Sequence, residues 1–180
     1  MSIVRTEQDE LSAAEKFSTE QNSEQYLTFI MNGEEYGVDI LSVQEIRGWA
    51  TATPLPNAPP HIKGVINLRG NIVPIVDLRL CFGMTAISYT NITVVIVLRV
   101  ESRDDKERII GIVVDGVSDV HAITRKEMKD APDLGDSVDT SYIKGLVSIN
   151  EKMVILLNLD QLLTLDELPD LPALRTELLH

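Results

Sequence analysis

The sequence has little of the residue types on which many binding and catalytic sites depend. It has one cysteine, Cys81, so no intrachain disulfide can form, and 4% of its residues are aromatic. Few aromatic side chains leave few stacking platforms for nucleic-acid bases. The 16 Lys and Arg residues stand against 28 Asp and Glu residues, which gives a formal net charge of -12. Because such a field repels phosphate backbones and anionic lipid headgroups, we expect neither nucleic-acid nor membrane-surface binding.

Long hydrophobic runs and targeting signals are also missing. The most apolar segment, ITVVIVLRV at residues 92–100, is too short to span a bilayer and contains Arg99. Residues 1–17 lack the basic-then-apolar order of a signal peptide. A single cysteine is compatible with a reducing compartment. We therefore expect a soluble cytoplasmic protein with no direct membrane insertion.

The chain shows no pattern typical of a catalytic, metal or cofactor site. His61, His121 and His180 do not have the spacing of metal ligands on one element, and no serine lies in a nucleophile-elbow pattern. Gly64 and Gly70 fit neither a phosphate-binding loop nor a dinucleotide fingerprint. We expect no catalytic residues, no metal and no cofactor. A binding module is favoured over an enzyme, although a missing motif does not exclude an enzyme.

Short alternating apolar segments dominate the rest of the sequence and predict a mostly β fold. Asn32-Gly33 between two such segments is a strong hairpin signal, and Asp115-Gly116 is a second hairpin-type turn. The alternation slips near Leu41, which predicts a bulge or a bend. The spacing of the strands is typical of small barrels or a sandwich.

Helical signals are few and short. Residues 78–83 fit one helical turn, a capping-box pattern at residues 124–127 predicts a short helix, and residues 160–168 predict a C-terminal helix. Residues 1–24 are polar and acidic with no sustained apolar face, which predicts a mobile N-terminal tail.

Two pairs of segments repeat in the same order along the chain. HIKGVINLRGNIVPIVDLRL at 61–80 resembles YIKGLVSINEKMVILLNLDQ at 142–161, and YGVDILSVQEI at 36–46 resembles IGIVVDGVSDV at 110–120. Hairpins rich in Val and Ile resemble one another by chance, but the shared Ile-Lys-Gly and the preserved order favour a duplication. The sequence thus predicts two similar β units that divide near residue 90, with exchange of strands between them left open. A groove between the units is a natural site for a partner.

Arg69 places a charge at the turn of the apolar hairpin GVINLRGNIVPIVDL. The common arrangement is an arginine that points into water while Gly70-Asn71 form the bend. The alternative is an ion pair with a carboxylate at the rim of an apolar surface, for which Glu45 is a candidate. The spacing of the residues does not decide between these two arrangements. It also does not decide whether Trp49 is a plug on a barrel or an anchor at an interface.

Several motifs occur in the order typical of one family: EEYGVDILSVQEIRG, IKGVINLRGNIVPIVDLR, TVVIVL and GIVVDGVSDV. With them, the chain resembles the CheW-like family of bacterial chemotaxis coupling proteins. The resemblance implies two SH3-like five-stranded β-barrels packed side by side, with short helices and a C-terminal helix. The expected limits are 25–165 for the CheW-like domain, 1–24 for the N-terminal tail and 166–180 for a C-terminal tail.

By this resemblance the chain is expected to be a non-catalytic cytoplasmic adaptor. The family links the cytoplasmic tips of methyl-accepting chemotaxis receptors to the regulatory domain of the histidine kinase CheA, in receptor arrays at the inner face of the membrane. Self-association in rings is left open, as is a role in another chemosensory system such as pilus motility. The alternative from a different class is a small ligand-binding protein or enzyme that uses the cleft between the barrels.

The resemblance also implies two contact surfaces. It matches Glu45 and Arg69 to the family's functionally sensitive acidic and basic pair. The receptor groove is expected at Val43, Glu45, Arg69, Val94, Val95, Gly111, Val117 and Val120. The kinase contact is expected at Asn67, Leu68, Gly70, Asn71 and Ile72. Arg69 would then stand between the two partner surfaces.

Overall fold

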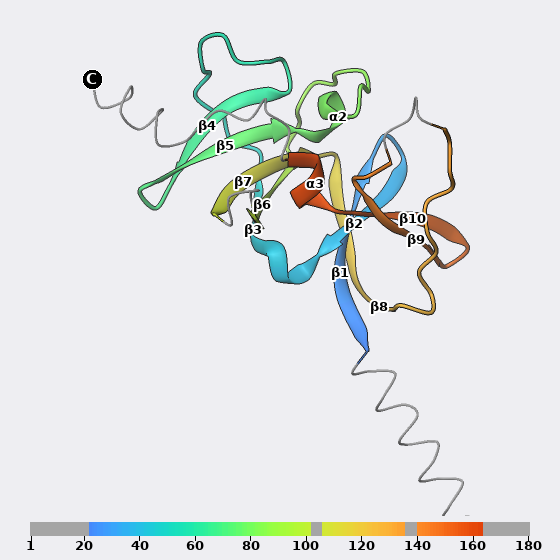
Figure 1. Ribbon diagram of the computed structural model, residues 1–180. Helices are drawn as coiled ribbons and strands as arrows, with labels where there is room; N and C mark the ends of the chain where they lie inside the picture. The colour runs from blue at the N-terminus through green and yellow to red at the C-terminus, as the bar shows by residue number, and fades with distance from the viewer. Residues whose placement is uncertain (1–21, 102–105, 136–139, 164–180) are drawn as a thin grey trace, which may run out of the picture.

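Two five-stranded sheets make up the fold, which is mostly β as expected (Figure 1). The structure is a computed structural model, and it describes residues 22–101, 106–135 and 140–163. Each sheet curls into an SH3-like barrel, and we call the two barrel A and barrel B. No helix in these described ranges is long and apolar enough to cross a membrane.

Barrel A is formed by strands from both ends of the chain, in the order β8-β1-β2-β10-β9. These strands are β1 (Ser23–Met31), β2 (Glu34–Asp39), β8 (Gly116–Thr124), β9 (Ile143–Ile149) and β10 (Lys152–Leu157). Barrel B is formed by the middle of the chain, in the order β3-β6-β7-β5-β4. These strands are β3 (Val43–Gly48), β4 (Ile62–Leu68), β5 (Asn71–Asp77), β6 (Val94–Glu101) and β7 (Glu107–Val114). The short helices are η1 (Ile40–Ser42), α2 (Leu78–Cys81) and α3 (Leu159–Leu163).

The barrels do not divide the chain near residue 90. The sequence repeats correspond to β1–β5 and β6–β10, but each barrel takes its first two strands from one repeat and its last three from the other. The chain crosses from one barrel to the other at η1, between β2 and β3, and again between β7 and β8. Because both crossings occur at the same place in the repeat, the two barrels have the same strand order.

Details of the backbone follow the repeat. In barrel B, β5 pairs in parallel with β7 at Gly111, and in barrel A, β10 pairs in parallel with β2 at Gly37. A Cβ on Gly111 would lie 2.6 Å from Ile75 Cδ1 and 2.9 Å from Val95 Cγ1, so a larger residue would force these packed side chains to shift. Asp77 and Asn158 cap α2 and α3 at equivalent positions.

The turns show where local signals were sufficient. Asn32 and Gly33 have φ of 52° and 77°, and they connect β1 to β2 in the expected tight hairpin. The expected hairpin at Asp115-Gly116 is wrong, because β7 belongs to barrel B and β8 to barrel A. The predicted helix at 124–127 is a single turn, after which Lys129 forms a β-bridge with Leu146 of β9.

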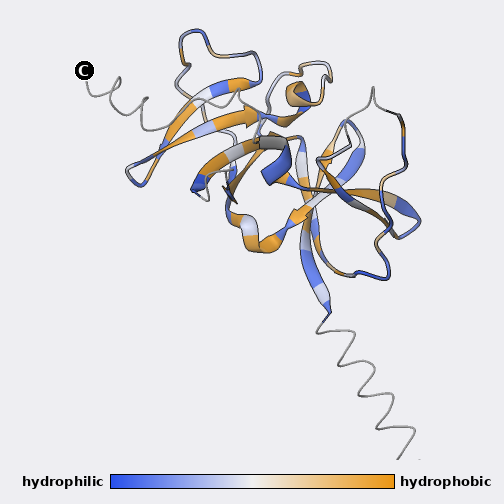
Figure 2. Cartoon of the chain, viewed as in Figure 1, coloured by the Kyte–Doolittle hydropathy of each residue, from blue (hydrophilic) through white to orange (hydrophobic). Residues whose placement is uncertain are grey.

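The largest core lies between the two barrels. It contains buried side chains from β1 and β2 of barrel A, from β6 and β7 of barrel B, and from both α2 and α3. Two smaller clusters occupy the barrel interiors, around Val97 in barrel B and around Tyr26 in barrel A. Figure 2 shows the same division, with hydrophobic residues along the strands and hydrophilic residues at the outer hairpin turns. Burial of the central cluster holds the two barrels together.

The first strand begins earlier than the sequence indicated. β1 starts at Ser23, where Ser23 and Glu24 pair with Thr124 and Ile123 of β8, so the end of the expected tail belongs to barrel A. The rest of that tail, residues 1–21, lies outside the described residues. Most of the expected C-terminal helix and the whole of the C-terminal tail also lie outside them.

Glu24 gives this first strand a pH-dependent anchor. Its carboxylate accepts hydrogen bonds from Lys144 Nζ at 2.9 Å and from the Tyr26 hydroxyl at 2.8 Å. The bond from Lys144 and then that from Tyr26 hold the pKa of Glu24 below its ordinary value of 4.5. A carboxylate whose pKa is lowered by folding stabilises the protein above its unfolded pKa, and this contribution is lost as the pH falls through the folded pKa.

We therefore expect Glu24→Gln to lower the urea midpoint at neutral pH, with a difference from the parent that shrinks as the pH falls below about 4.5. Equilibrium unfolding at a series of pH values measures this difference. Glu127→Gln, at an exposed position, is the matched control. A difference that stays constant from neutral to acidic pH would contradict the assignment.

Candidate functional site

The turn between β4 and β5 carries the Arg69–Glu45 ion pair that the sequence left open. Arg69 Nη2 lies 3.4 Å from Glu45 Oε2. The Arg69 side chain is 80% exposed and that of Glu45 is 29% exposed, so water screens the pair. Such a pair contributes no more than about 1 kcal/mol to stability. Its charges therefore remain available to a partner.

The backbone fixes where Arg69 stands. Leu68 pairs with Asn71, so Arg69 and Gly70 are the two loop residues, with φ of 53° and 86°. Two positive φ values in a two-residue loop are typical of a type I′ hairpin turn. The Asn67 side chain accepts a 2.8 Å hydrogen bond from the Gly70 N–H. The bend is therefore at Arg69-Gly70 and not at Gly70-Asn71 as expected.

β3 and β4 are the two edge strands of the sheet that forms barrel B. Because the sheet curls, these edges approach each other, and Glu45 of β3 comes close to the turn after β4. A bulge between Val43 and Glu45, at the slip that the sequence indicated, shifts the register of β3 against β6. The ion pair thus joins β3 to the β4–β5 turn. We call this place, defined by Glu45 and Arg69, the mouth of barrel B.

The five residues expected to contact the kinase lie together at this hairpin tip. Asn67, Gly70 and Asn71 are exposed, while Leu68 and Ile72 are half-buried. Asn67 pairs with Ile72 and Leu68 pairs with Asn71, so the set forms one compact ladder end next to Arg69. Figure 1 shows the β4–β5 hairpin projecting from the molecule, far from barrel A.

The residues expected to contact the receptor fall into three groups. Glu45 and Arg69 form the ion pair at the mouth of barrel B. Val43, Val94 and Val117 are half-buried and pack against the rim of the central core. Val120 is 43% exposed on β8, the edge strand of barrel A.

Val95 and Gly111 do not lie on an exposed groove, which corrects the expectation for these two residues. Val95 is 3% exposed and packs inside barrel B. Gly111 is buried beside it, within the strand pair of β5 and β7. Val95 points inward because side chains alternate along β6, and residues adjacent in sequence face opposite sides. Substitutions at these two positions would act through packing and not through direct contact.

Two exposed apolar residues near this surface were missed. Leu41 in η1 is 84% exposed, and Ile46 in β3 is 45% exposed. Ile46 is the repeat counterpart of Val120, with the same register: Ile46 pairs with Ile96, and Val120 with Leu27. The repeat alignment was the signal that could have found Ile46. Exposed apolar residues on edge strands are typical of contact surfaces.

Trp49 is a plug and not an exposed anchor. Its ring is half-buried against the barrel B interior and lies 4.3 Å from the Tyr89 ring centroid. The Tyr89 hydroxyl donates a hydrogen bond to the Asp77 carboxylate. Burial, followed by this hydrogen bond, raises the pKa of Tyr89 above its ordinary value of 10.0. The cluster holds the loop between α2 and β6 and leaves Trp49 unable to serve as a projecting contact.

The arrangement is suited to binding. Within residues 22–101, 106–135 and 140–163, no group of three or more His, Cys, Asp or Glu side chains could hold a metal ion. The site consists instead of one exposed ion pair, a projecting hairpin and exposed apolar side chains on edge strands. These features are those of a polar and apolar protein interface.

Comparison with known proteins gives this arrangement a family. The family model described as CheW-like domain matches residues 25–167. Chemotaxis protein CheW of Klebsiella aerogenes is 44% identical over 158 residues, which span 88% of this chain and 92% of that protein. Chemotaxis protein CheW of Rhizobium meliloti is 38% identical over 141 residues, which span 78% of this chain and 88% of that protein.

A solved structure shares the fold. The crystal structure of scaffolding protein TtCheW from Thermoanaerobacter tengcongensis matches with a TM-score of 0.71 and 28% identity, over 83% of this chain and 98% of that one. The motifs, the barrel pair and the sequence relatives agree over most of the length. The chain belongs to the CheW-like domain family of chemotaxis proteins.

Proposed function

We propose that this chain is a non-catalytic adaptor that couples methyl-accepting chemotaxis receptors to the histidine kinase CheA. The observation that carries the proposal is the exposed Arg69–Glu45 pair at the turn of the projecting β4–β5 hairpin. An ion pair that contributes so little to stability leaves its charges available to a partner, and its position between two candidate surfaces suits a role in recognition. Membership of the chemotaxis family supports this role over catalysis.

The proposal assigns the two surfaces as follows. The receptor tip contacts Glu45, Arg69 and the exposed side of the rim at Val43, Val94, Val117 and Val120. An amphipathic helical hairpin fits such small apolar residues flanked by charge. The regulatory domain of the kinase contacts the hairpin tip, residues 67–72 without Arg69. We place the CheW-like domain at residues 25–165, to which β1 adds Ser23 and Glu24 at its start.

The mechanism is scaffolding. A protein that binds receptor and kinase together raises the effective concentration of one at the other, so two weak contacts make a stable assembly. The receptor then biases kinase activity through its differential affinity for two arrangements of the complex. The adaptor works in the cytoplasm at receptor arrays, where it also has the opportunity to associate with itself in rings. It need supply no chemistry.

Co-sedimentation tests the proposal directly. Receptor-bearing membranes, a CheA-type kinase and this protein are mixed, with each component omitted in turn, and kinase autophosphorylation is followed. We expect the kinase to sediment and to be activated only when this protein is present. If the protein binds neither partner, the adaptor role fails, and a ligand screen for the alternative class of small-molecule binder is the next step.

Arg69→Glu is expected to abolish coupling while the fold is retained. The side chain is 80% exposed and its ion pair is screened, so the loss of stability should stay below about 1 kcal/mol. The reversed charge places two carboxylates together at the junction and repels the surfaces that fit the native pair. The measurement is kinase activation in the co-sedimentation assay, with urea unfolding as the check on folding.

Arg99→Glu is the matched control, because Arg99 is also an exposed arginine on barrel B paired with a glutamate, at 3.5 Å from Glu107. It should leave coupling unchanged. The charge-swapped double variant Glu45→Arg/Arg69→Glu distinguishes pairing from recognition: regained coupling would mean that the pair alone matters. A folded Arg69→Glu protein that activates the kinase normally would overturn the role given to this residue.

A further inference from the structure

Arg69 has a backbone conformation that is unfavourable for arginine. In the part of the chain that the structure describes, three hairpins close with a two-residue loop. The first loop residues are Asn32, Arg69 and Asn150, with φ of 52°, 53° and 50°. Asparagine tolerates this left-handed conformation because its short polar side chain forms hydrogen bonds with the nearby backbone, which an arginine side chain does not replace. An arginine in this loop therefore needs support from another residue.

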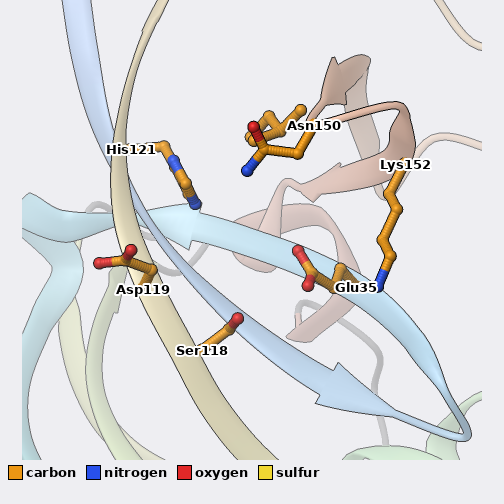
Figure 3. Close-up of a pocket in the computed structure, with 7 residues that line it drawn as sticks. Glu35, Ser118, Asp119, His121, Asn150 and Lys152 are labelled. Atoms are coloured by element: carbon orange, nitrogen blue, oxygen red, sulfur yellow. The ribbon is translucent and has the colours of Figure 1, made fainter.

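The equivalent turn of barrel A shows that the fold does not require this arginine. The repeat aligns Glu45 with Asp119 and Arg69 with Asn150. Figure 3 shows Asn150 and Asp119 around one opening, with the Asp119 carboxylate directed away from it. That carboxylate accepts a 2.8 Å hydrogen bond from the Val120 N–H. The barrel A turn thus closes with an uncharged asparagine, so the arginine of barrel B serves something other than closure of the turn.

Asn67 supplies the support that Arg69 needs. Its side-chain oxygen accepts the 2.8 Å hydrogen bond from the N–H of Gly70, the second loop residue. This bond spans Arg69 and fixes the peptide group that follows it. The equivalent positions in the other two hairpins hold Ile30 and Ser148, and neither side chain carries an amide or carboxylate oxygen. The hairpin with the arginine is the one that has the asparagine acceptor two residues earlier.

The place of the Arg69 guanidinium depends on this turn. Because the side chain is 80% exposed, packing does little to orient it, and its ion-pair partner Glu45 lies on another strand. A turn that relaxes out of the left-handed conformation changes the direction of the Cα–Cβ bond, which moves the guanidinium away from Glu45. Asn67 is itself exposed, so its side chain acts here through the hydrogen bond and not through core packing.

We propose that Asn67 is a positioning residue that holds the Arg69 guanidinium at the mouth of barrel B for the partner. This role rests on the adaptor function proposed above, and it adds an effect through Arg69 to the place of Asn67 in the hairpin tip. A group that is already held in its bound position loses less freedom on binding and so binds more tightly. The amide oxygen of Asn67 carries the effect, because it is the atom that accepts the Gly70 N–H. A role by direct contact alone would depend equally on its NH2 donors.

The test compares variants of the full chain labelled with ¹⁵N. Asn67→Ala removes the acceptor, whereas Asn67→Asp keeps an acceptor oxygen and removes the NH2 donors. Asn91→Ala, at an exposed turn of barrel B outside both proposed surfaces, is the matched control. We expect the Gly70 amide to exchange about fivefold faster in Asn67→Ala, and the Glu45 amide resonance to shift as the ion pair loosens. Asn67→Asp and Asn91→Ala should resemble the parent in both measurements.

Kinase activation in the co-sedimentation assay is the second measurement, with urea unfolding as the check on folding. Asn67→Ala should need about fivefold more protein for half-maximal activation, and Asn67→Asp should restore the parent value. Activation by Asn67→Asp as weak as that by Asn67→Ala would overturn the proposal, as would an Asn67→Ala protein that activates like the parent. If the parent itself fails to activate the kinase, the adaptor function fails, whereas the Gly70 and Glu45 amides still show whether Asn67 holds the arginine. The two failures are therefore distinguishable.

Discussion

Replacement of Arg79 by methionine should lower the free energy of unfolding by about 3 kcal/mol. Arg79 lies on α2 with its side chain 8% exposed, and its Nη1 lies 2.9 Å from Asp115 Oδ2. Its Nε and Nη2 both donate to the Thr85 carbonyl at 3.1 Å. The same Asp115 oxygen accepts a 2.8 Å hydrogen bond from the Asn32 N–H. Arg79 thus ties barrel B to the β7–β8 crossover and, through Asp115, to the β1–β2 turn of barrel A.

The size of the effect follows from what the substitution leaves behind. Methionine keeps much of the side-chain volume but leaves the carboxylate of Asp115 without its cation, and an uncompensated buried charge costs about 3–5 kcal/mol. The lower end applies because the Asp115 side chain is 24% exposed. Urea unfolding monitored by Trp49 fluorescence measures the change.

Arg99→Met is the control, since Arg99 and Glu107 form a pair on the surface, and its loss should cost less than about 1 kcal/mol. The double variant Arg79→Met/Asp115→Asn should recover part of the lost stability, because no unpaired charge remains. If Arg79→Met unfolds at the same urea concentration as Arg99→Met, the connection between the barrels does not depend on this pair.

Gly64→Ala should be the most destabilising glycine substitution in the chain, with a loss of at least about 3 kcal/mol. Gly64 has φ of 133°, a conformation that L side chains rarely adopt, and an added Cβ would overlap the carbonyl oxygen of Thr53. The overlap is with backbone, which is held there by hydrogen bonds of 2.9 Å in both directions between Thr53 and Val65. The connector cannot move aside without breaking this bridge.

The repeat supplies a graded comparison. At the equivalent position, a Cβ on Gly145 would meet the Met128 side chain, which has the freedom to change rotamer, so Gly145→Ala should cost less. Gly48 in β3 has open space around it, and Gly48→Ala should be neutral or slightly stabilising. Thermal unfolding of the three variants tests the order. A Gly64→Ala protein as stable as Gly48→Ala would show that the connector is not fixed over β4.

Sequence signals predicted the structure correctly where the conformation depends on interactions between neighbouring residues. Asn32-Gly33 predicted a tight hairpin because those residue types tolerate positive φ, and the structure has it. Asp115-Gly116 carried a similar signal but became a crossover, because β7 pairs with β5 and β6 of barrel B whereas β8 pairs with β1 of barrel A. Likewise, the capping box at Thr124 formed only a turn, because the next residues bridge to β9 over Gly145.

The candidate site divides in the same way. The hairpin tip at residues 67–72 could be found from sequence, because a ladder and its turn are neighbours along the chain. The inward orientation of Val95 could not be found from sequence, because residues 92–100 are apolar on both faces of the strand, and the pattern does not show which face meets the barrel interior.

The sequence by itself determined the class of fold, the duplication and the family. Strand alternation, turn residues and repeated motifs are patterns of residues that are close together in the chain, so the sequence shows them directly. Only the tertiary structure decided that the repeats exchange strands and that Arg69 bridges to Glu45. These facts depend on contacts between strands distant in the chain. The free energy of these contacts comes from burial and from ion pairing between distant segments, and a pattern of neighbouring residues does not indicate it.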